Sequence, residues 1–393
     1  IDYMVGMLNR PLFGSNWSNS AKCGSRSSNW NNPALNLNAN IGTRGVTETK
    51  GLTLRLTVST RPEGQIHNGG VSGLVGIPDA RRRIFMRRHG NLWPLVTAPE
   101  NIELAYQRAK KGKTWQSTIQ RVERRKDEVL SDIRRSLLDR TFTTSEYRTK
   151  NVHEPKERTI YVLPFAPDRI VQHALMAVVS PIWDKMFDDA SHACRPGRGQ
   201  HSASRAVMAN VRKYRYVLQG DVRKFYPSVN HDIVLEIIEK KIKDPSVLWL
   251  LEDIVRSFPG NTNVPIGNLT SQWLGNLYMN EFDRYVKDTL RPGGYLRYND
   301  DFLLFDDDKA HLRERHERCR SFLWNRLKLV MAKDKLYPVS HGVDFVGYRH
   351  FRDKVLIRKS TAKRVKARIR RLRYELATGL IETEKARSVV AST

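Results

Sequence analysis

Two adjacent aspartates interrupt an otherwise apolar part of the sequence, and this feature limits the local fold more than any other. Asp300 and Asp301 stand between residues 295–297 (Tyr-Leu-Arg) and residues 302–305 (Phe-Leu-Leu-Phe). Two apolar segments joined by so short a polar interval predict a β-hairpin over residues 295–305. Two like charges about 4 Å apart repel by roughly 4 kcal/mol at an effective dielectric of 20, so we expect a cation nearby to compensate.

A third carboxylate, Asp221, stands at the end of another predicted strand, residues 214–222. Three carboxylates that converge on a sheet edge supply the oxygen ligands that Mg²⁺ requires. Two such ions about 3.5–4 Å apart can activate a 3′-hydroxyl and stabilise a leaving pyrophosphate. Taken alone, adjacent aspartates in a turn are more often just a polar turn. The denser cluster at residues 306–308 directly precedes a predicted helix over 309–328, so we interpret it as helix-capping residues.

Several segments resemble the motifs of reverse transcriptases, in order and spacing, over about residues 86–390. Residues 298–301 (Tyr-Asn-Asp-Asp) resemble the Tyr-x-Asp-Asp box of these enzymes. Residues 221–228 (Asp-Val-Arg-Lys-Phe-Tyr-Pro-Ser) resemble the motif that carries the first metal-binding aspartate. Residues 264–272 resemble the motif that contacts template and nucleotide, and residues 343–348 resemble the primer-grip hairpin. Further segments resemble finger motifs: residues 155–158, 168–173 and 193–199.

The resemblance implies an α+β chain with the right-hand polymerase fold. We expect fingers at residues 86–215, a palm with an antiparallel sheet at residues 216–350, and a partial helical thumb, cut short, at residues 351–393. The mixed order of helix-like and strand-like segments also favours an α+β fold over a regular βαβ array.

Within the predicted fingers, residues 100–140 are expected to form two basic amphipathic helices. Asp168 is expected to cap a helix that ends at Pro181. Arg195 and Arg198 lie in a finger motif, and the resemblance implies that they contact nucleic acid.

The resemblance assigns the metal site to the three aspartates. Asp221, Asp300 and Asp301 would hold two Mg²⁺ ions, for which Mn²⁺ could substitute, and Val222 would offer its backbone carbonyl. Tyr226 would pack under the sugar and exclude a ribose 2′-hydroxyl, which favours deoxynucleotides. A core aromatic residue is the alternative interpretation of Tyr226.

Basic side chains of the finger motifs are expected to neutralise the triphosphate and the template phosphates. These residues are Arg158, Lys156 and Arg169, with a solvated surface charge as the alternative for Lys156. Lys333 is the candidate cation beside the leaving pyrophosphate, and Lys335 is its alternative.

Two residues of the segment 264–272 are expected to meet the nascent base pair. Gln272 would touch the template or the nucleotide, although a plain polar residue on a helix is the alternative. Many reverse transcriptases carry Gln where this chain has Ile266. Because an aliphatic side chain cannot hydrogen-bond the minor-groove edge of the base pair, we expect reduced fidelity.

Residues 358–373 contain nine basic side chains and no acidic one. Val365, Ile369, Leu372 and Leu376 keep one helical face apolar, so we expect a helix that docks by one face and presents charge to duplex phosphate. A solvated basic helix is the alternative. The residues expected to contact nucleic acid here are Lys363, Arg364, Lys366, Arg370 and Arg371.

The charge of the whole chain agrees with a nucleic-acid partner. Lys and Arg number 68 against 41 Asp and Glu, which leaves a net charge of +27. Three scattered cysteines do not form a disulfide scaffold, so a reducing compartment such as the cytoplasm is expected. The family resemblance implies a protein encoded by a bacterium or a phage. The longest apolar run is far shorter than the roughly 20 residues of a membrane span, so we expect no membrane association. A non-catalytic RNA-binding protein on a polymerase scaffold is the alternative from another functional class.

Residues 1–85 differ in composition from the rest, with nine asparagines among the first 40 residues. Residues 14–44 resemble the variable end of the C-type-lectin-like proteins that diversity-generating retroelements diversify. Residues 86–93 resemble the usual start of the reverse transcriptases of such elements, which makes Met86 the expected initiator. We interpret residues 1–85 as a poorly structured leader that is largely a translated template repeat. An authentic flexible extension and a lectin-like fragment are the alternatives.

The resemblance therefore implies an RNA-directed DNA polymerase of a diversity-generating retroelement. It would copy a template-repeat RNA into mutagenised cDNA for retrohoming, with dNTPs as substrates and a small basic accessory protein as partner. Reverse transcriptases of the group II intron type and of the retron type are the alternatives within the class.

Overall fold

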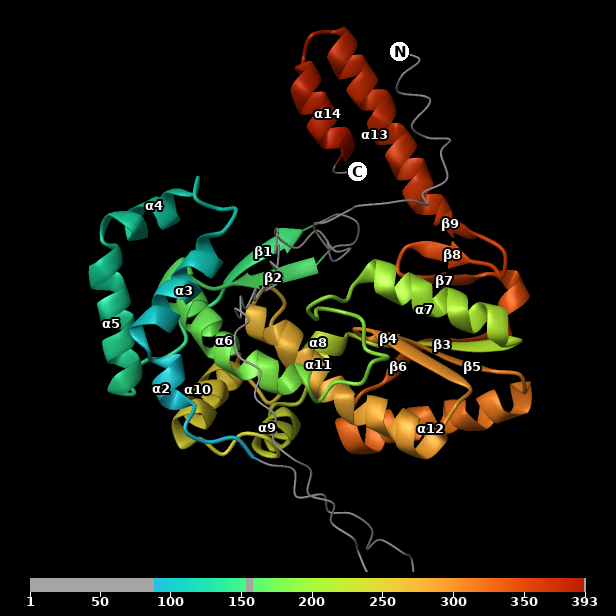
Figure 1. The fold of residues 1–393 in the computed structure, drawn as a ribbon, viewed down its shortest axis with the longest axis horizontal. Coiled ribbons are helices and arrows are strands. Elements are labelled where there is room, and N and C mark those ends of the chain that lie inside the picture. The colour runs from blue at the N-terminus through green and yellow to red at the C-terminus, as the bar shows by residue number, and fades with distance from the viewer. Residues whose placement is uncertain (1–87, 153–157, 392–393) are drawn as a thin grey trace, which may run out of the picture. The chain divides into compact units, whose positions relative to one another are not determined.

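The computed structural model describes residues 88–152 and 158–391 (Figure 1). The predictions for residues 1–85 and for Lys156 lie outside these residues. In the described part, no helix is both long enough and apolar enough to cross a membrane.

A four-stranded antiparallel sheet forms the centre of the predicted palm. Its strand order is β4-β5-β3-β6, with β4 (Gly294–Tyr298), β5 (Asp301–Asp306), β3 (Tyr216–Val222) and β6 (Met331–Pro338). β3 and β5 carry apolar side chains on both faces, because helices cover the sheet on both sides. The expectation of an α+β chain with an antiparallel sheet is confirmed.

Helices from different parts of the chain cover the two faces of this sheet (Figure 1). On one face, Val207 and Val211 of α7 (Gln200–Lys213) pack with Val217 of β3. On the other face, α11 (Leu269–Arg284) and α12 (Lys309–Leu327) pack in the larger core that contains Leu218. Alternate residues of β3 thus enter different cores, as the pleat of a strand requires.

The predicted fingers are mainly helical. They contain α2 (Trp93–Val96), α3 (Pro99–Lys110), α4 (Ser117–Arg124), α5 (Lys126–Leu138), β1 (Arg148–Val152), β2 (Arg158–Val162), η2 (Phe165–Arg169) and α6 (Ile170–Asp184). β1 and β2 pair with each other in an antiparallel hairpin. Three helices rather than the expected two occupy residues 100–140, because a break at Arg125 separates α4 from α5.

Two expectations for α6 were wrong. The helix continues through Pro181, because Val179 and Trp183 on either side of the proline are fully buried, and this burial offsets the missing hydrogen bond. Asp168 does not cap the helix, since Arg169 is the residue that precedes α6 and no side chain accepts a capping hydrogen bond there. Its Oδ1 instead accepts a hydrogen bond from the backbone N–H of Ser145 at 2.8 Å.

Short elements complete the region around the sheet. These are α8 (Phe225–Ser228), α9 (His231–Glu239), α10 (Pro245–Arg256), η3 (Tyr285–Leu290) and η4 (Val339–His341). The predicted capping role at residues 306–308 is confirmed for Asp308, whose carboxylate accepts a hydrogen bond from the backbone of Ala310 at 2.6 Å.

The C-terminal part begins with a second, three-stranded antiparallel sheet. It consists of β7 (Val343–Phe345), β8 (Tyr348–His350) and β9 (Val355–Ile357), in that order. α13 (Lys359–Ala377) and α14 (Thr383–Ala391) follow. α13 is amphipathic as expected: Leu372 is buried, whereas most of its basic side chains are exposed.

Candidate active site

The hairpin between β4 and β5 turns at Asn299 and Asp300. Tyr298 pairs with Asp301 across the hairpin, so only two residues form the turn. Asn299 has a φ of 62°, in the left-handed region that asparagine tolerates better than most residues. The expected hairpin over residues 295–305 is therefore confirmed, with the adjacent aspartates at its tip.

Asp221 and Asp301 lie at the same end of two paired strands. Gly220 of β3 pairs with Phe302 of β5, and Asp221 directly follows the first residue while Asp301 directly precedes the second. Residues directly opposed in an antiparallel pair have Cβ atoms roughly 4.5–5.5 Å apart. Asp221, Asp300 and Asp301 are all half-buried. The sheet thus brings the three predicted aspartates to the same end of its two central strands.

The backbone beside Asp221 is specialised. A Cβ atom on Gly220 would lie 2.3 Å from Cζ of Phe302, so the aromatic ring occupies the space that any other residue would need. On the other side of β3, the register with β6 shifts between Asp221 and Val222. Such irregularities redirect side chains and are common beside active sites.

The three aspartates fit magnesium by their chemistry. They supply carboxylate oxygens alone, which is the ligand type that Mg²⁺ prefers. Val222, the predicted carbonyl donor, is 2% exposed and lies next to Asp221 at the end of β3. Among residues 88–152 and 158–391, no three His, Cys, Asp or Glu side chains are grouped closely enough to hold a metal ion as they stand.

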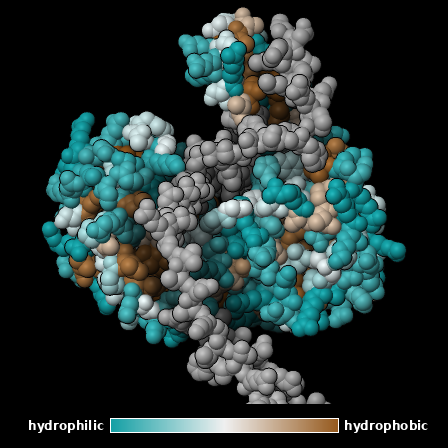
Figure 2. Space-filling view, viewed as in Figure 1, coloured by the Kyte–Doolittle hydropathy of each residue, from teal (hydrophilic) through white to brown (hydrophobic). Residues whose placement is uncertain are grey.

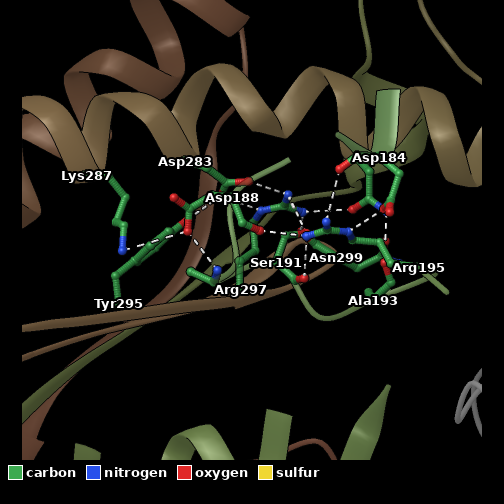
Figure 3. Close-up of polar contacts among 12 residues, drawn as sticks. Asp184, Asp188, Ser191, Ala193, Arg195, Asp283, Lys287, Tyr295, Arg297 and Asn299 are labelled. Carbon is green, nitrogen blue, oxygen red and sulfur yellow. Dashed lines mark hydrogen bonds and ion pairs between the residues drawn. The ribbon is translucent and has the colours of Figure 1, made fainter. Parts of the chain in front are cut away.

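A buried arginine, Arg297, contacts the turn at Asn299 (Figure 3). Arg297 of β4 is fully buried, and its Nε and Nη2 donate to the two carboxylate oxygens of Asp283 at 2.7 and 2.6 Å. Its Nη1 donates to the backbone carbonyl of Asn299 at 2.8 Å and to Oδ1 of Asn276 at 3.2 Å. Nη2 also donates to the hydroxyl of Ser191 at 3.0 Å.

This network keeps its charges in a region without solvent. Burial lowers the pKa of the Arg297 guanidinium, but the adjacent Asp283 carboxylate outweighs this effect and the pKa is raised. The Tyr295 hydroxyl donates to Oδ1 of Asp283 at 2.5 Å. Burial, and next the same carboxylate, raise the pKa of Tyr295 well above its ordinary value.

Neither Arg297 nor Asp283 was among the site residues predicted from the sequence. A cation near the aspartates was expected, but no residue of the hairpin itself was proposed for it. The available signal was the position of Arg297, a charged residue in an otherwise apolar strand two residues before the turn. An arginine in a buried strand almost always has a charged or polar partner, so its position in this strand indicates a buried partner.

Tyr226 reaches the turn from α8. Its hydroxyl donates to the side-chain oxygen of Asn299 at 3.3 Å. The ring is half-buried and packs against Phe225, with 5.1 Å between ring centroids. A Cβ atom on Gly275 would lie 3.2 Å from Cε1 of Tyr226, so α11 approaches the ring closely. The structure therefore places Tyr226 beside the aspartate turn.

The loop before α11 contacts the β1–β2 hairpin. The backbone N–H of Tyr161 donates to the carbonyl of Ile266 at 3.1 Å. Gly267 has a φ of 126°, and a Cβ atom there would lie 2.5 Å from the carbonyl oxygen of Tyr161. Asn268 donates to the hydroxyl of Tyr147 at 3.0 Å. These contacts bring β2, which begins at Arg158, to the segment that carries Ile266.

The other predicted nucleotide-binding residues lie on several elements. Gln272 is half-buried on the first turn of α11. The backbone of Lys333 pairs with that of Asp221, whereas Lys335 pairs with Gln219, two residues further from the turn. Arg169 is half-buried at the end of η2, and burial lowers its pKa.

The two predicted finger arginines are bound within the protein. Arg195 is 8% exposed, and its Nε donates to Oδ1 of Asp184 at 2.7 Å. It also donates to the carbonyls of Asp188 and Ser191. This geometry favours a structural role over a phosphate contact. Arg198 forms an ion pair with Asp189, which is more exposed than Asp184, the partner of Arg195.

The predicted phosphate-contacting residues of α13 are all exposed: Lys363, Arg364, Lys366, Arg370 and Arg371. Arg371 donates to Glu375 on the same helix at 2.7 Å. Figure 2 shows hydrophilic side chains over most of the visible surface around α12 as well.

Comparison with known proteins identifies a family and several relatives. The family described as reverse transcriptase (RNA-dependent DNA polymerase) matches residues 150–350, just over half of the chain. Protein YkfC of Escherichia coli is 28% identical over 277 residues, which cover 58% of this chain and 69% of YkfC. The group II intron-encoded protein LtrA of Lactococcus lactis is 24% identical over 170 residues, covering 41% of this chain and 28% of LtrA.

Two further similarities are to an intron maturase and to a telomerase. Nuclear intron maturase 1 of Arabidopsis thaliana is 32% identical over 93 residues, covering 24% of this chain and 13% of the maturase. Among solved structures, apo telomerase from Candida tropicalis matches with a TM-score of 0.42 and 12% identity, covering 56% of this chain and 55% of the telomerase chain.

Proposed function

The chain belongs to the reverse transcriptase family, and on this basis we propose that it synthesises DNA on an RNA template from dNTPs. The observation that carries the proposal is the position of Asp221 and Asp301 on paired strands, next to the turn at Asp300. Carboxylate oxygens are the ligands that Mg²⁺ prefers, so three such groups at one end of the sheet support the proposal.

We propose that Asp221, Asp300 and Asp301, with the Val222 carbonyl, hold two Mg²⁺ ions or Mn²⁺ in their place. The chemistry that the ions supply when bound is activation of the primer 3′-hydroxyl and charge neutralisation at the leaving pyrophosphate. The chain's own contribution is to keep the carboxylates together against their mutual repulsion. The hairpin turn and the paired strand β3 do so by their backbone register.

The nucleotide would meet side chains from three directions. We propose that Tyr226 supports the sugar and excludes a 2′-hydroxyl, since it lies against the turn. Arg158, Lys156 and Arg169 would contact phosphates from the fingers, and Lys333 would lie beside the pyrophosphate. Gln272 would contact the template or the nucleotide from α11.

Ile266 is proposed to lower fidelity. Its backbone is fixed by the hydrogen bond from Tyr161, so its aliphatic side chain has a defined place in the loop. A glutamine there could hydrogen-bond the minor-groove edge of the new base pair. We expect Ile266→Gln to misincorporate less often than the wild-type protein on the same RNA template, and equal error rates would refute this role.

We propose further that the enzyme serves a diversity-generating retroelement, with a template-repeat RNA and a small basic accessory protein. The sequences of residues 14–44 and 86–93 support this role. LtrA and the intron maturase among the relatives favour the alternative, a group II intron-type enzyme. Sequencing the flanking DNA separates the two. A near copy of the segment encoding residues 14–44, differing at template adenines, supports the retroelement, whereas its absence favours the intron type.

The polymerase activity itself is tested by primer extension on an RNA template. We expect the wild-type chain to extend a DNA primer with dNTPs and the variant Asp300→Asn/Asp301→Asn to lose extension. Asp307→Asn/Asp308→Asn is the matched control, because it neutralises an adjacent pair of exposed aspartates at the opposite end of β5. A wild-type chain that binds the template without extension would instead support the non-catalytic alternative.

A further inference from the structure

The ion pair between Arg297 and Asp283 is the most completely buried charged contact beside the aspartate turn. Both side chains are 0% exposed. Asp283 comes from the last turn of α11, and Arg297 comes from β4. The pair therefore ties a helix to the strand that leads directly into the turn.

The arginine uses all three of its nitrogens on fixed partners. Nε and one terminal nitrogen bind Asp283, while the other terminal nitrogen binds the carbonyl of Asn299 at 2.8 Å and Asn276 at 3.2 Å. Ser191, from the segment before α7, accepts a further hydrogen bond at 3.0 Å. Of these partners, Asn299 alone belongs to the turn.

Asn299 is thus held from two directions. Its backbone carbonyl accepts from Arg297, and its side-chain oxygen accepts from the Tyr226 hydroxyl at 3.3 Å. The residue also occupies the left-handed region, with a φ of 62°. Because Asp300 and Asp301 follow directly in the chain, the position of Asn299 determines where both carboxylates begin.

We propose that Arg297 is a positioning residue for the catalytic carboxylates, and that Asp283 orients it. The inference rests on the proposed function, since it assigns to the pair the task of placing the metal-binding aspartates. Arg297 touches neither substrate nor metal in this role. It acts through the Asn299 carbonyl, which it holds at the base of the turn.

Stability alone explains the pair poorly. Replacement of a buried ion pair by apolar residues of similar volume is often neutral or stabilising, so burial of the pair is weak evidence for a stabilising role. A guanidinium, however, presents a rigid planar fork that can bind a carboxylate with two nitrogens and still donate elsewhere. A lysine ammonium lacks that geometry. The choice of arginine therefore fits a requirement for geometry.

Two variants separate positioning from folding. Arg297→Lys keeps the charge opposite Asp283 but loses the fork that reaches Asn299. Arg297→Met/Asp283→Leu removes both charges together, so no unpaired charge is left in the core. The matched control is Arg315→Lys, because Arg315 of α12 pairs with Asp306 at the opposite end of β5 and donates to Leu290 at 3.1 Å.

The readouts are Mn²⁺ binding by electron paramagnetic resonance, thermal melting, and primer extension as a function of Mg²⁺ concentration. We expect Arg297→Lys and the double variant to bind Mn²⁺ and to extend primer about 10- to 100-fold more weakly, as is typical when support of metal ligands is lost. The double variant should melt close to the wild-type chain. Arg315→Lys should match the wild type in Mn²⁺ affinity and extension.

The outcomes distinguish this inference from the proposed function. Wild-type Mn²⁺ affinity and extension in a folded double variant would overturn the positioning role and leave the pair a structural one. Equal losses in Arg315→Lys would also overturn it, because they would show a general response to weakened packing. A wild-type chain that binds Mn²⁺ but does not extend primer would refute the polymerase function, while the Mn²⁺ titrations would still decide the role of Arg297.

Discussion

The aspartate turn and helix α13 both depend on charged side chains, but the two regions hold these charges differently. Beneath the turn, Arg297 and Asp283 are fully buried and bind each other through two nitrogens. On α13, Lys363 and Arg364 are exposed to solvent, as is most of the basic face. The first region fixes atoms in place, whereas the second presents charge without fixing it.

The physical cost explains the difference. A buried charge requires a partner with suitable geometry, because removal of that partner leaves an unpaired charge in a medium of low dielectric constant. An exposed charge keeps its hydration and needs no fixed partner, although its interactions weaken with salt. Buried, paired charges suit chemistry that depends on the position of carboxylates. Exposed charges suit contact with a repetitive phosphate backbone.

Among changes away from the aspartates, the largest effect is expected from Gly267→Ala, which displaces the loop against the β1–β2 hairpin. The new Cβ atom would lie 2.5 Å from the carbonyl oxygen of Tyr161, at a φ of 126° that side chains rarely adopt. We expect extension to fall about 10²-fold, since a displacement of about 1 Å can have that effect. Steady-state primer extension measures this loss.

The control for this glycine is Gly260→Ala. Gly260 also has a positive φ, of 93°, but no atom lies within 4 Å of its added Cβ. Backbone strain is therefore common to both variants, whereas the close contact belongs to Gly267 alone. Equal losses in the two variants would show that the contact with Tyr161 does not matter.

A smaller and different effect is expected on α13. The variant Lys363→Ala/Arg364→Ala should weaken binding of a primer–template duplex about tenfold and reduce the slope of log K against log salt by about 1 for each phosphate that the variant no longer neutralises. The saturating rate of extension should remain that of the wild type. Filter binding over a salt series tests this, and an unchanged slope would contradict phosphate binding by these residues.

A further effect concerns acid stability, which should arise at two buried histidines and not on α13. Burial, and next nearby cations, lower the pKa of His173 to about 3 and that of His192 to about 4. Because the unfolded chain takes up protons first, stability should fall as the pH drops from about 6.5 toward 4. The expected slope is about 1.4 kcal/mol per pH unit for each histidine.

Chemical unfolding across this pH range provides the measurement. His173→Gln should flatten the dependence of unfolding free energy on pH, whatever its effect on stability at neutral pH. The control is His311→Gln, which replaces an exposed histidine on α12. A slope that stays the same in His173→Gln would exclude the buried imidazole as its source.

The sequence predicted well what local patterning determines. The apolar segments around Asp300 and Asp301 were enough to locate the hairpin. The spacing of apolar residues by three or four positions was enough to locate the apolar face of α13. In both cases the signal lies within a few residues, where strand and helix periodicity act directly.

The sequence could not predict the contacts between distant segments. Arg297 forms hydrogen bonds with Asp283 on a helix and with Ser191 on a loop. The sequence around each of these residues contains no signal that they are in contact. The continuation of α6 through Pro181 has the same origin, because tertiary burial outweighed a local helix-breaking signal. Such features depend on how helices and strands pack against one another, and this packing cannot be inferred from a single sequence.

The most direct test of the central claim is the single-turnover rate of adding one dNTP to a primer on an RNA template. The wild-type chain and Asp221→Asn are compared at saturating template, with the dissociation constant measured separately. We expect the rate to fall by about 10³-fold or more, since several kcal/mol of charge stabilisation is removed, while the dissociation constant stays the same. An Asp221→Asn variant that extends primer at the wild-type rate would contradict the assignment of the site.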